Sequence, residues 1–120
     1  MTNKILLIED ELDLVEVTKM RLEKSGYEVI SALSGEDAFT FLQKDIPDLI
    51  LLDLLLPGIQ GEEVCKKIKC DDRLKTIPVI LFTASASDIP KVVKEVGADD
   101  YVTKPFEPEE LLSKIKKFIG

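Results

Sequence analysis

Hydrophobic and polar positions follow two alternating patterns along the chain. Short apolar runs typical of β-strands are Ile5–Ile8, Tyr27–Ser31, Leu49–Leu52, Val79–Phe82 and Tyr101–Val102. The third and fourth runs lack polar alternation, which predicts strands covered on both faces. Between the runs, residues 12–25, 35–45, 61–70, 88–96 and 107–119 have helical periodicity. Strands that alternate with helices predict an α/β domain with a parallel sheet and right-handed crossovers.

Local signals place several helix boundaries. Ser34 followed by Asp37 resembles a capping box that opens the second helix. Gly26 is expected to end the first helix, and Pro47 to end the second. The fourth helix has the weakest pattern, because its start is rich in Ser and Ala and Pro90 interrupts it.

Length and charge narrow the class of protein. The 120 residues suit one domain, and neither a repeat nor a linker divides them, so we expect one domain over 1–120. The net charge of −7 argues against direct binding of nucleic acid by this chain. No apolar stretch is long enough for a signal peptide or membrane span, which predicts a cytoplasmic protein without membrane insertion.

The two cysteines fit the same compartment. Cys65 and Cys70 stand five residues apart on a predicted helix, where side chains diverge, so we expect free thiols. Because the chain has no histidine, a structural zinc site is excluded.

Polar residues follow four of the predicted strands. They are Glu9-Asp10, Asp53, Thr83 and Lys104-Pro105. In an open parallel sheet, ligands bind outside the carboxyl ends of the strands. If the first, third, fourth and fifth strands are adjacent, these side chains meet at one rim.

Such a rim needs positive charge. Two carboxylates about 5 Å apart repel by roughly 3 kcal/mol at an effective dielectric of about 20. Lys104 supplies one charge, and Mg²⁺ suits an all-oxygen site better than zinc does. A carboxylate can attack phosphorus to form an acyl phosphate, and Asp53 is the candidate because it ends the most apolar strand. Lys104 and the Thr83 hydroxyl would then bind phosphoryl oxygens.

Four strings in order carry a family resemblance. They are Ile8-Glu9-Asp10-Glu11, Asp53-Leu54-Leu55-Leu56-Pro57-Gly58 with Gly61, Pro78-Val79-Ile80-Leu81-Phe82-Thr83-Ala84, and Gly97-Ala98-Asp99-Asp100-Tyr101-Val102-Thr103-Lys104-Pro105-Phe106. Over essentially the whole chain, the sequence resembles the receiver domain of two-component response regulators. The resemblance implies a flavodoxin-like (βα)5 fold with five parallel strands in the order 2-1-3-4-5 and helices on both faces.

The resemblance also implies residue roles at the rim. Asp53 matches the phosphoacceptor and a metal ligand. Asp10 matches a direct Mg²⁺ ligand, Glu9 one that acts mostly through water, and the Leu55 carbonyl the remaining protein ligand. The family often has two aspartates where this chain has Glu9-Asp10, and the longer glutamate favours water-mediated contact.

Further implied roles concern the phosphoryl group and its effect. Thr83, Lys104 and the Ala84 amide match phosphoryl contacts. Thr83 and Tyr101 match a switch pair, and the Lys104–Pro105 bond is expected to be cis. The implied phosphodonor is a sensor histidine kinase or a phosphotransfer protein. The surface of the fourth helix, fifth strand and fifth helix would then select a downstream output partner, and the only catalysis would be of its own phosphotransfer and dephosphorylation.

Each residue also has a simpler interpretation. Asp10 could cap the first helix, and Asp53 could open a turn. Thr83 could merely end a strand, and Lys104 could lie on the surface. Tyr101 could be half-buried packing. Their combination at successive strand ends favours the site.

Three other functions compete with the receiver interpretation. A phosphatase with an aspartyl nucleophile usually carries a second acid two residues later, where this chain has Leu55. A binding module without phosphorylation should have lost an acid or the lysine. A flavodoxin needs a Ser/Thr/Gly phosphate loop after the first strand, where this chain has Glu9-Asp10-Glu11.

Overall fold

The computed structural model describes residues 3–84 and 89–120. Its strands are β1 (Lys4–Ile8), β2 (Glu28–Ala32), β3 (Leu49–Leu52), β4 (Val79–Thr83) and β5 (Asp100–Thr103). Its helices are α1 (Leu12–Lys24), α2 (Gly35–Leu42), α3 (Gly61–Cys70), α4 (Ile89–Val96) and α5 (Pro108–Ile119). Across these two described ranges, no helix combines the length and the apolar character needed to cross a membrane.

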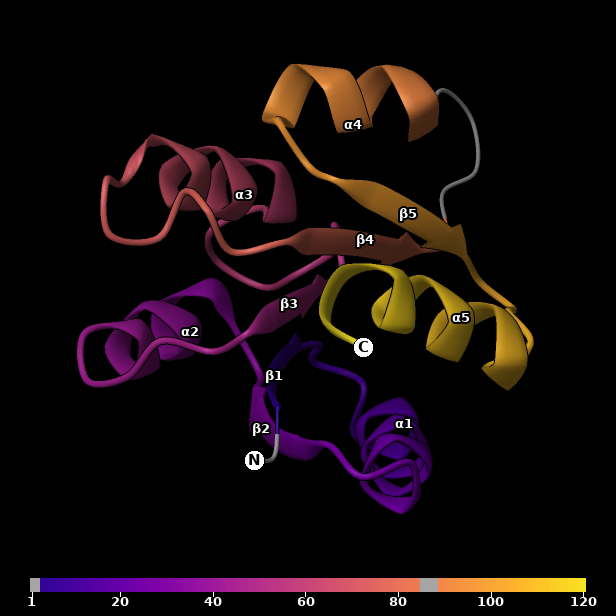
Figure 1. The fold of residues 1–120 in the computed structure, drawn as a ribbon. Coiled ribbons are helices and arrows are strands. Elements are labelled where there is room, and N and C mark those ends of the chain that lie inside the picture. The colour runs from indigo at the N-terminus through magenta and orange to yellow at the C-terminus, as the bar shows by residue number, and fades with distance from the viewer. Residues whose placement is uncertain (1–2, 85–88) are drawn as a thin grey trace.

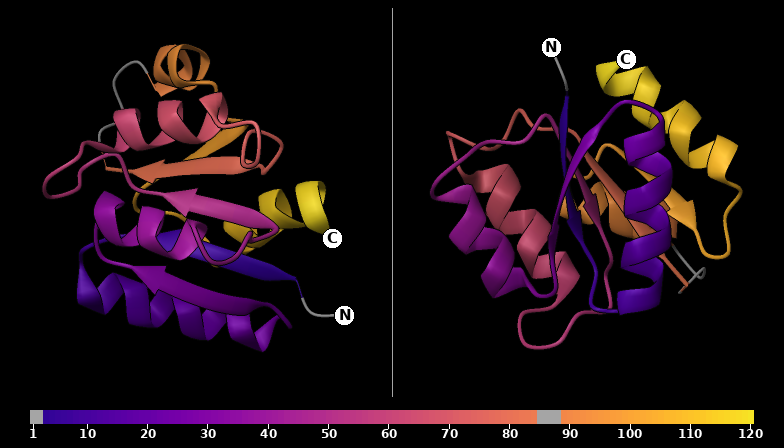
Figure 2. Two further views of the ribbon diagram at one scale, coloured as in Figure 1. Left: turned by 90° about the vertical axis from the view of Figure 1, so that its left-hand side faces the viewer. Right: turned by 90° about the horizontal axis from the view of Figure 1, so that it is seen from below.

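The strands form one parallel sheet in the order β2-β1-β3-β4-β5. Figures 1 and 2 show the sheet between two helical layers. Helices α1 and α5 pack on one face, and α2, α3 and α4 on the other. The flavodoxin-like fold predicted from the sequence is therefore confirmed, including its strand order.

The two faces of the sheet contribute to two separate cores. Alternate residues of β1 enter different layers, with Leu6 in the α2/α3/α4 layer and Leu7 in the α1/α5 layer. Every residue of β3 and β4 is buried, which confirms that these apolar runs are covered on both faces. The central strands are consequently rigid supports for the segments that follow them.

Most boundaries lie within one residue of their predicted positions, but α2 is shorter than expected. The Ser34 hydroxyl accepts from the Asp37 amide at 3.1 Å, and Gly26 follows α1 with φ +98°. Helix α2 ends at Leu42 instead of residue 45, so the prediction that Pro47 ends it is wrong. The guanidinium of Arg73 donates to the Leu42 carbonyl and replaces the next helical amide.

Pro90 does not interrupt the fourth helix. It lies within α4, which runs from Ile89 to Val96 in the described residues. The Ser- and Ala-rich start predicted for this helix falls largely on residues 85–88, which lie outside the described residues.

The cysteines are free, as predicted. Burial raises the pKa of the Cys65 thiol to about 11, and its sulfur lies 3.5 Å from the Val96 carbonyl oxygen. Cys70 is exposed at the end of α3. The two thiols therefore differ strongly in access.

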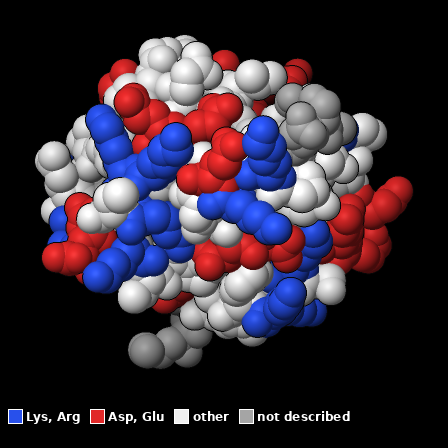
Figure 3. Space-filling view, turned by 90° about the horizontal axis from the view of Figure 1, so that it is seen from above, with Lys and Arg blue, Asp and Glu red and all other residues white. Residues whose placement is uncertain are grey.

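Charged side chains of both signs share the surface seen from the α4 side. In Figure 3, Lys and Arg side chains lie among Asp and Glu side chains on this face. Several basic side chains gather at the left of this view, and acidic side chains border them.

Candidate functional site

Backbone hydrogen bonds extend three strands by one residue at their carboxyl ends. The Glu9 amide donates to Ala32 at 3.0 Å, and the Asp53 amide donates to Ile8 at 3.0 Å. The Lys104 amide donates to Thr83 at 2.9 Å. The sheet ladder thus fixes the backbone of all three charged residues at one rim.

The period of a strand then decides where their side chains lie. Glu9, Asp53 and Lys104 each stand two residues after a core residue of the α1/α5 layer. Successive side chains of a strand alternate between faces, so all three lie toward the same layer. The spacing of these three residues along their strands is therefore enough to bring their side chains to one face of the sheet.

Lys104 bridges the two acids. Its Nζ lies 2.6 Å from Oε1 of Glu9 and 3.0 Å from Oδ2 of Asp53. The side chains are 17%, 1% and 6% exposed, respectively. Burial lowers the pKa of Lys104, but the hydrogen bonds that its ammonium donates to both carboxylates outweigh this effect and raise the pKa above its ordinary value. Lys104 therefore stays protonated, and it is not an ordinary surface lysine.

The effect of burying this ion pair is seen in the pKa of Glu9. Burial raises the pKa of Glu9 from 4.5 to about 6, although hydrogen bonds from Lys104 and the Glu11 amide oppose the rise. The Glu11 amide lies 3.1 Å from Oε2. Glu9 is thus a poorly solvated carboxylate that gains from a nearby cation.

We expect the shifted pKa of Glu9 to give a specific pH dependence of stability. Native Glu9 binds its proton more tightly than the unfolded chain does, so its contribution is present below pH 4.5 and is lost as pH rises through about 6. The loss amounts to about 2 kcal/mol. Urea unfolding in EDTA should show wild type losing stability relative to Glu9→Gln across this window. If wild type instead gained stability relative to Glu9→Gln as the pH rises, the assignment would be contradicted.

The acid cluster fits a hard divalent cation. One carboxylate oxygen from each of Glu9, Asp10 and Asp53 can lie within 4.8 Å of the others. Oxygen donors with room for water suit Mg²⁺. Asp10 is exposed, and the N-cap of α1 is Glu11, which makes no side-chain cap bond. The capping interpretation of Asp10 therefore finds no support, and its carboxylate faces outward at the cluster.

The chain after Asp53 turns tightly. Oδ1 of Asp53 accepts from the Leu55 amide at 3.1 Å, so this aspartate does open a turn. The Leu55 side chain is exposed. The role of its carbonyl as a metal ligand stays a prediction.

Gly61 allows α3 to begin against the Asp53 turn, a close approach that the sequence alone did not reveal. A Cβ at Gly61 would lie 2.4 Å from the Leu54 Cα and 2.5 Å from the Asp53 carbonyl oxygen. Both are backbone atoms that cannot move aside locally.

Gly61→Ala is accordingly expected to lower the free energy of unfolding by about 1–3 kcal/mol. This overpacking exceeds the gain in helix propensity, which is at most about 1 kcal/mol. Urea unfolding measures the change. The control is Glu63→Ala, at an exposed position of the same first turns, which should stay within about 0.5 kcal/mol of wild type. Equal stability of both variants would contradict the close approach.

The remaining predicted residues belong to β4, β5 and the residues that follow these strands. Thr83 is fully buried at the end of β4, and Ala84 after it is exposed. The Lys104–Pro105 peptide bond is cis. Tyr101 is half-buried, and Nζ of Lys114 lies 5.0 Å from its ring centroid.

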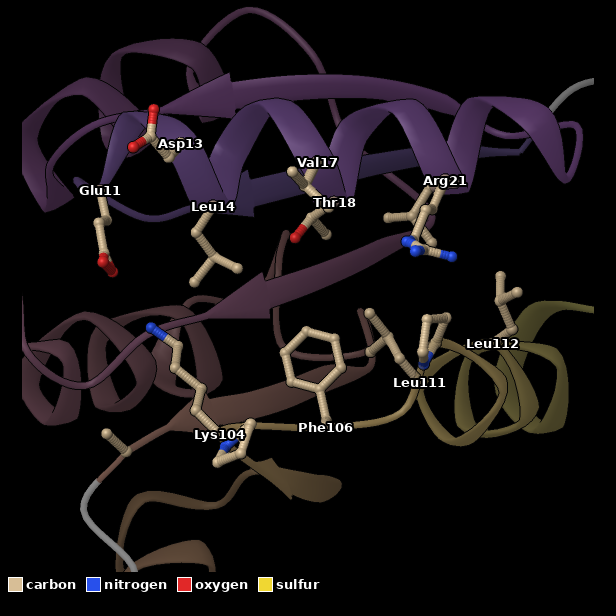
Figure 4. A pocket seen from close by; sticks show the side chains of 14 residues that line it. Glu11, Asp13, Leu14, Val17, Thr18, Arg21, Lys104, Phe106, Leu111 and Leu112 are labelled. Carbon is tan, nitrogen blue, oxygen red and sulfur yellow. The ribbon is translucent and has the colours of Figure 1, made fainter.

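A large apolar cavity adjoins the site between α1 and α5. Its volume is about 630 Å³, and Figure 4 shows Glu11 and Lys104 at one end. Leu14, Val17 and Leu111 belong to its apolar lining. Lys104 lies at its end, so the cavity is a neighbour of the acid cluster.

Known proteins are similar to this chain in sequence and in fold. The family model of the response regulator receiver domain matches residues 5–116. A receiver domain of a signal transduction histidine kinase from Syntrophus aciditrophicus is 37% identical, with 98% of this chain and 90% of that chain covered and a TM-score of 0.92. The chemotaxis response regulator CheY4 of Vibrio cholerae is 29% identical, with 98% and 99% covered and a TM-score of 0.91.

A third relative holds a metal. The receiver domain of the sensor histidine kinase PA1611 from Pseudomonas aeruginosa, solved with magnesium in its active-site cleft, is 29% identical. The match covers 100% of this chain and 99% of that chain, with a TM-score of 0.90. With a family match over most of its length and relatives that share its fold, the chain belongs to the response regulator receiver domain family.

Proposed function

We propose that this chain is a phosphorylation switch whose phosphoacceptor is Asp53. The observation that carries the proposal is the ion-paired cluster, in which Lys104 lies within 3.0 Å of both Glu9 and Asp53. The phosphodonor is a phosphohistidine of a sensor histidine kinase or phosphotransfer protein. No second acid follows Asp53 at position 55, so turnover of small phosphoesters is disfavoured.

The transfer forms one bond and breaks another. A carboxylate oxygen of Asp53 attacks phosphorus as the bond from phosphorus to the donor histidine nitrogen breaks. The electron pair stays on that nitrogen, and the ring leaves as neutral imidazole because its other nitrogen holds a proton. Lys104 moves from its carboxylate partners to a phosphoryl oxygen, and the Thr83 hydroxyl and Ala84 amide donate to the others.

Mg²⁺ fits the same cluster. Asp10 and Asp53 would bind it directly, Glu9 mostly through water, and the Leu55 carbonyl would complete the protein ligands. When bound, it supplies positive charge that neutralises the carboxylates and the incoming phosphoryl group. The relative with magnesium in its cleft supports this assignment.

The output is a shift between two packings. Movement of Thr83 toward the phosphoryl group leaves space into which Tyr101 turns, and the surface of α4, β5 and α5 changes its preferred partner. We further propose that residues 1–120 act as one receiver domain in the cytoplasm, where free thiols persist. Catalysis is confined to its own phosphotransfer and dephosphorylation.

Intact-mass spectrometry tests the proposal. Wild-type protein incubated with acetyl phosphate and Mg²⁺ should gain the mass of one phosphoryl group, and EDTA should prevent the gain. Unmodified protein under conditions in which a known receiver domain is phosphorylated would refute the function.

Metal binding has its own expected result. Mg²⁺ at ten times its dissociation constant should raise the free energy of unfolding by about 1.4 kcal/mol, because the ion binds only the folded cluster. Thermal unfolding in Mg²⁺, against Na⁺ at equal ionic strength, measures the effect. Asp10→Asn should reduce the shift, whereas Asp72→Asn, whose side chain is 96% exposed, should not. Equal shifts in both variants would exclude Asp10 as a ligand.

A further inference from the structure

Phe82 and Lys104 are brought together by the pairing of β4 with β5. Phe82 stands opposite Val102 in the parallel register. Lys104 is two residues after Val102, and residues two apart on a strand lie on the same face. The side chains of Phe82 and Lys104 therefore lie on the same face of the sheet, on neighbouring strands.

The contact has the geometry of a cation–π interaction. Nζ of Lys104 lies 5.0 Å from the centroid of the Phe82 ring. Phe82 is fully buried, and the edge of its ring packs at 76° to Phe106, with 6.3 Å between centroids. Figure 4 shows Lys104 extending toward Glu11, with Phe106 next along the lining. The ring is therefore buried and packed against a second ring, and the ammonium lies over it.

The ring differs from the other partners of Lys104 in one respect. Glu9 and Asp53 belong to the acid cluster that fits a cation, and a carboxylate with a bound cation attracts an ammonium less. An aromatic face is not a ligand of Mg²⁺, so its attraction for the ammonium does not fall in this way. The contact is also shielded from water, which strengthens it.

We propose that Phe82 is a positioning residue for Lys104, and that its ring keeps the ammonium beside Asp53 when the carboxylates are otherwise engaged. Part of this inference rests on the proposed function, since the reaction concerned is phosphoryl transfer to Asp53. The location of the ammonium over the ring does not depend on that reaction.

The first test weakens the ring electronically without changing its shape. Phenylalanine with one to four ring fluorines is placed at position 82, and the rate constant for phosphorylation by acetyl phosphate is measured. The rate should fall steadily with fluorine number, by roughly 3- to 10-fold over the series. Fluorination of Phe39, a half-buried ring 5.9 Å from Nζ of Lys67 and outside the site, is the matched control and should give no trend.

The second test needs neither metal nor phosphodonor. In the metal-free protein, the Lys104 ε-methylene protons should resonate upfield of a free lysine, because they lie over the ring face. Phe82→Leu should remove the shift, and Phe39→Leu should leave it unchanged.

The two tests separate the possible failures. A flat rate series in a protein that is phosphorylated would overturn the proposal, because a purely structural ring would not respond to fluorine number. Absence of phosphorylation in wild type would refute the proposed function, and the methylene shift would then decide whether Phe82 places Lys104. An unshifted methylene signal in wild type would overturn the placement itself.

Discussion

Asp53→Asn is expected to abolish phosphoryl incorporation from acetyl phosphate in the presence of Mg²⁺. An amide occupies the same space but lacks the anionic oxygen that attacks phosphorus. The side chain is only 6% exposed, and it accepts hydrogen bonds from Lys104 and the Leu55 amide. Intact-mass spectrometry should show the gain in wild type and none in the variant.

A matched substitution controls for a general effect of removing an acid. Asp72→Asn changes an aspartate whose side chain is 96% exposed, and it should be phosphorylated as wild type is. A phosphoryl-sized gain that persists in Asp53→Asn would rule out Asp53 as the acceptor. It would also redirect attention to Asp10 or Glu9 in the same cluster.

Lys104→Met has the largest expected effect on stability. Methionine keeps much of the side-chain volume but leaves Glu9 and Asp53 buried without their cation. Breaking a buried pair from one side typically costs about 3–5 kcal/mol. Glu9 can limit the loss by holding its proton, so we expect about 2–4 kcal/mol at pH 8 in EDTA. Urea unfolding measures it.

Mg²⁺ distinguishes this explanation from simple loss of packing. A divalent ion replaces the missing charge, so it should stabilise Lys104→Met more than wild type. Lys75→Met removes a lysine whose side chain is 54% exposed from a surface pair, and it should cost at most about 1 kcal/mol with no enhanced response to Mg²⁺. The phosphorylation rate of Lys104→Met should fall by about 100-fold, as for removal of one transition-state donor. A variant as stable as wild type in EDTA would contradict the account.

The layered fold was predictable because its signals are local. Apolar runs without alternation marked the central strands, and polar residues after them marked the rim. The ends of parallel strands share one edge, so the meeting of Glu9, Asp53 and Lys104 followed from order along the chain once the strands were adjacent.

What escaped prediction depends on contacts between distant residues. Helix α2 ends early where Arg73, 31 residues away, donates to the Leu42 carbonyl. The sequence showed Gly61 only as part of the motif that follows Asp53, because its closeness to the Leu54 backbone exists only after folding. The sequence indicated only that Phe82 belongs to an apolar strand in the core, although the register of β4 with β5 could have placed it beside Lys104. The alternation of side chains along each strand was the signal that could have identified Phe82 as a neighbour of Lys104.

The unequal access of the two thiols makes the molecule easy to label. Cys65 is enclosed and its pKa is about 11, whereas Cys70 is open to solvent. A maleimide dye should therefore attach at a single place without mutagenesis. Helix α3 starts at Gly61 beside the turn after Asp53 and ends at Cys70, so the dye would sit about 14 Å along the helix from Gly61. Such a reporter could follow partner encounters by fluorescence while leaving the rim intact.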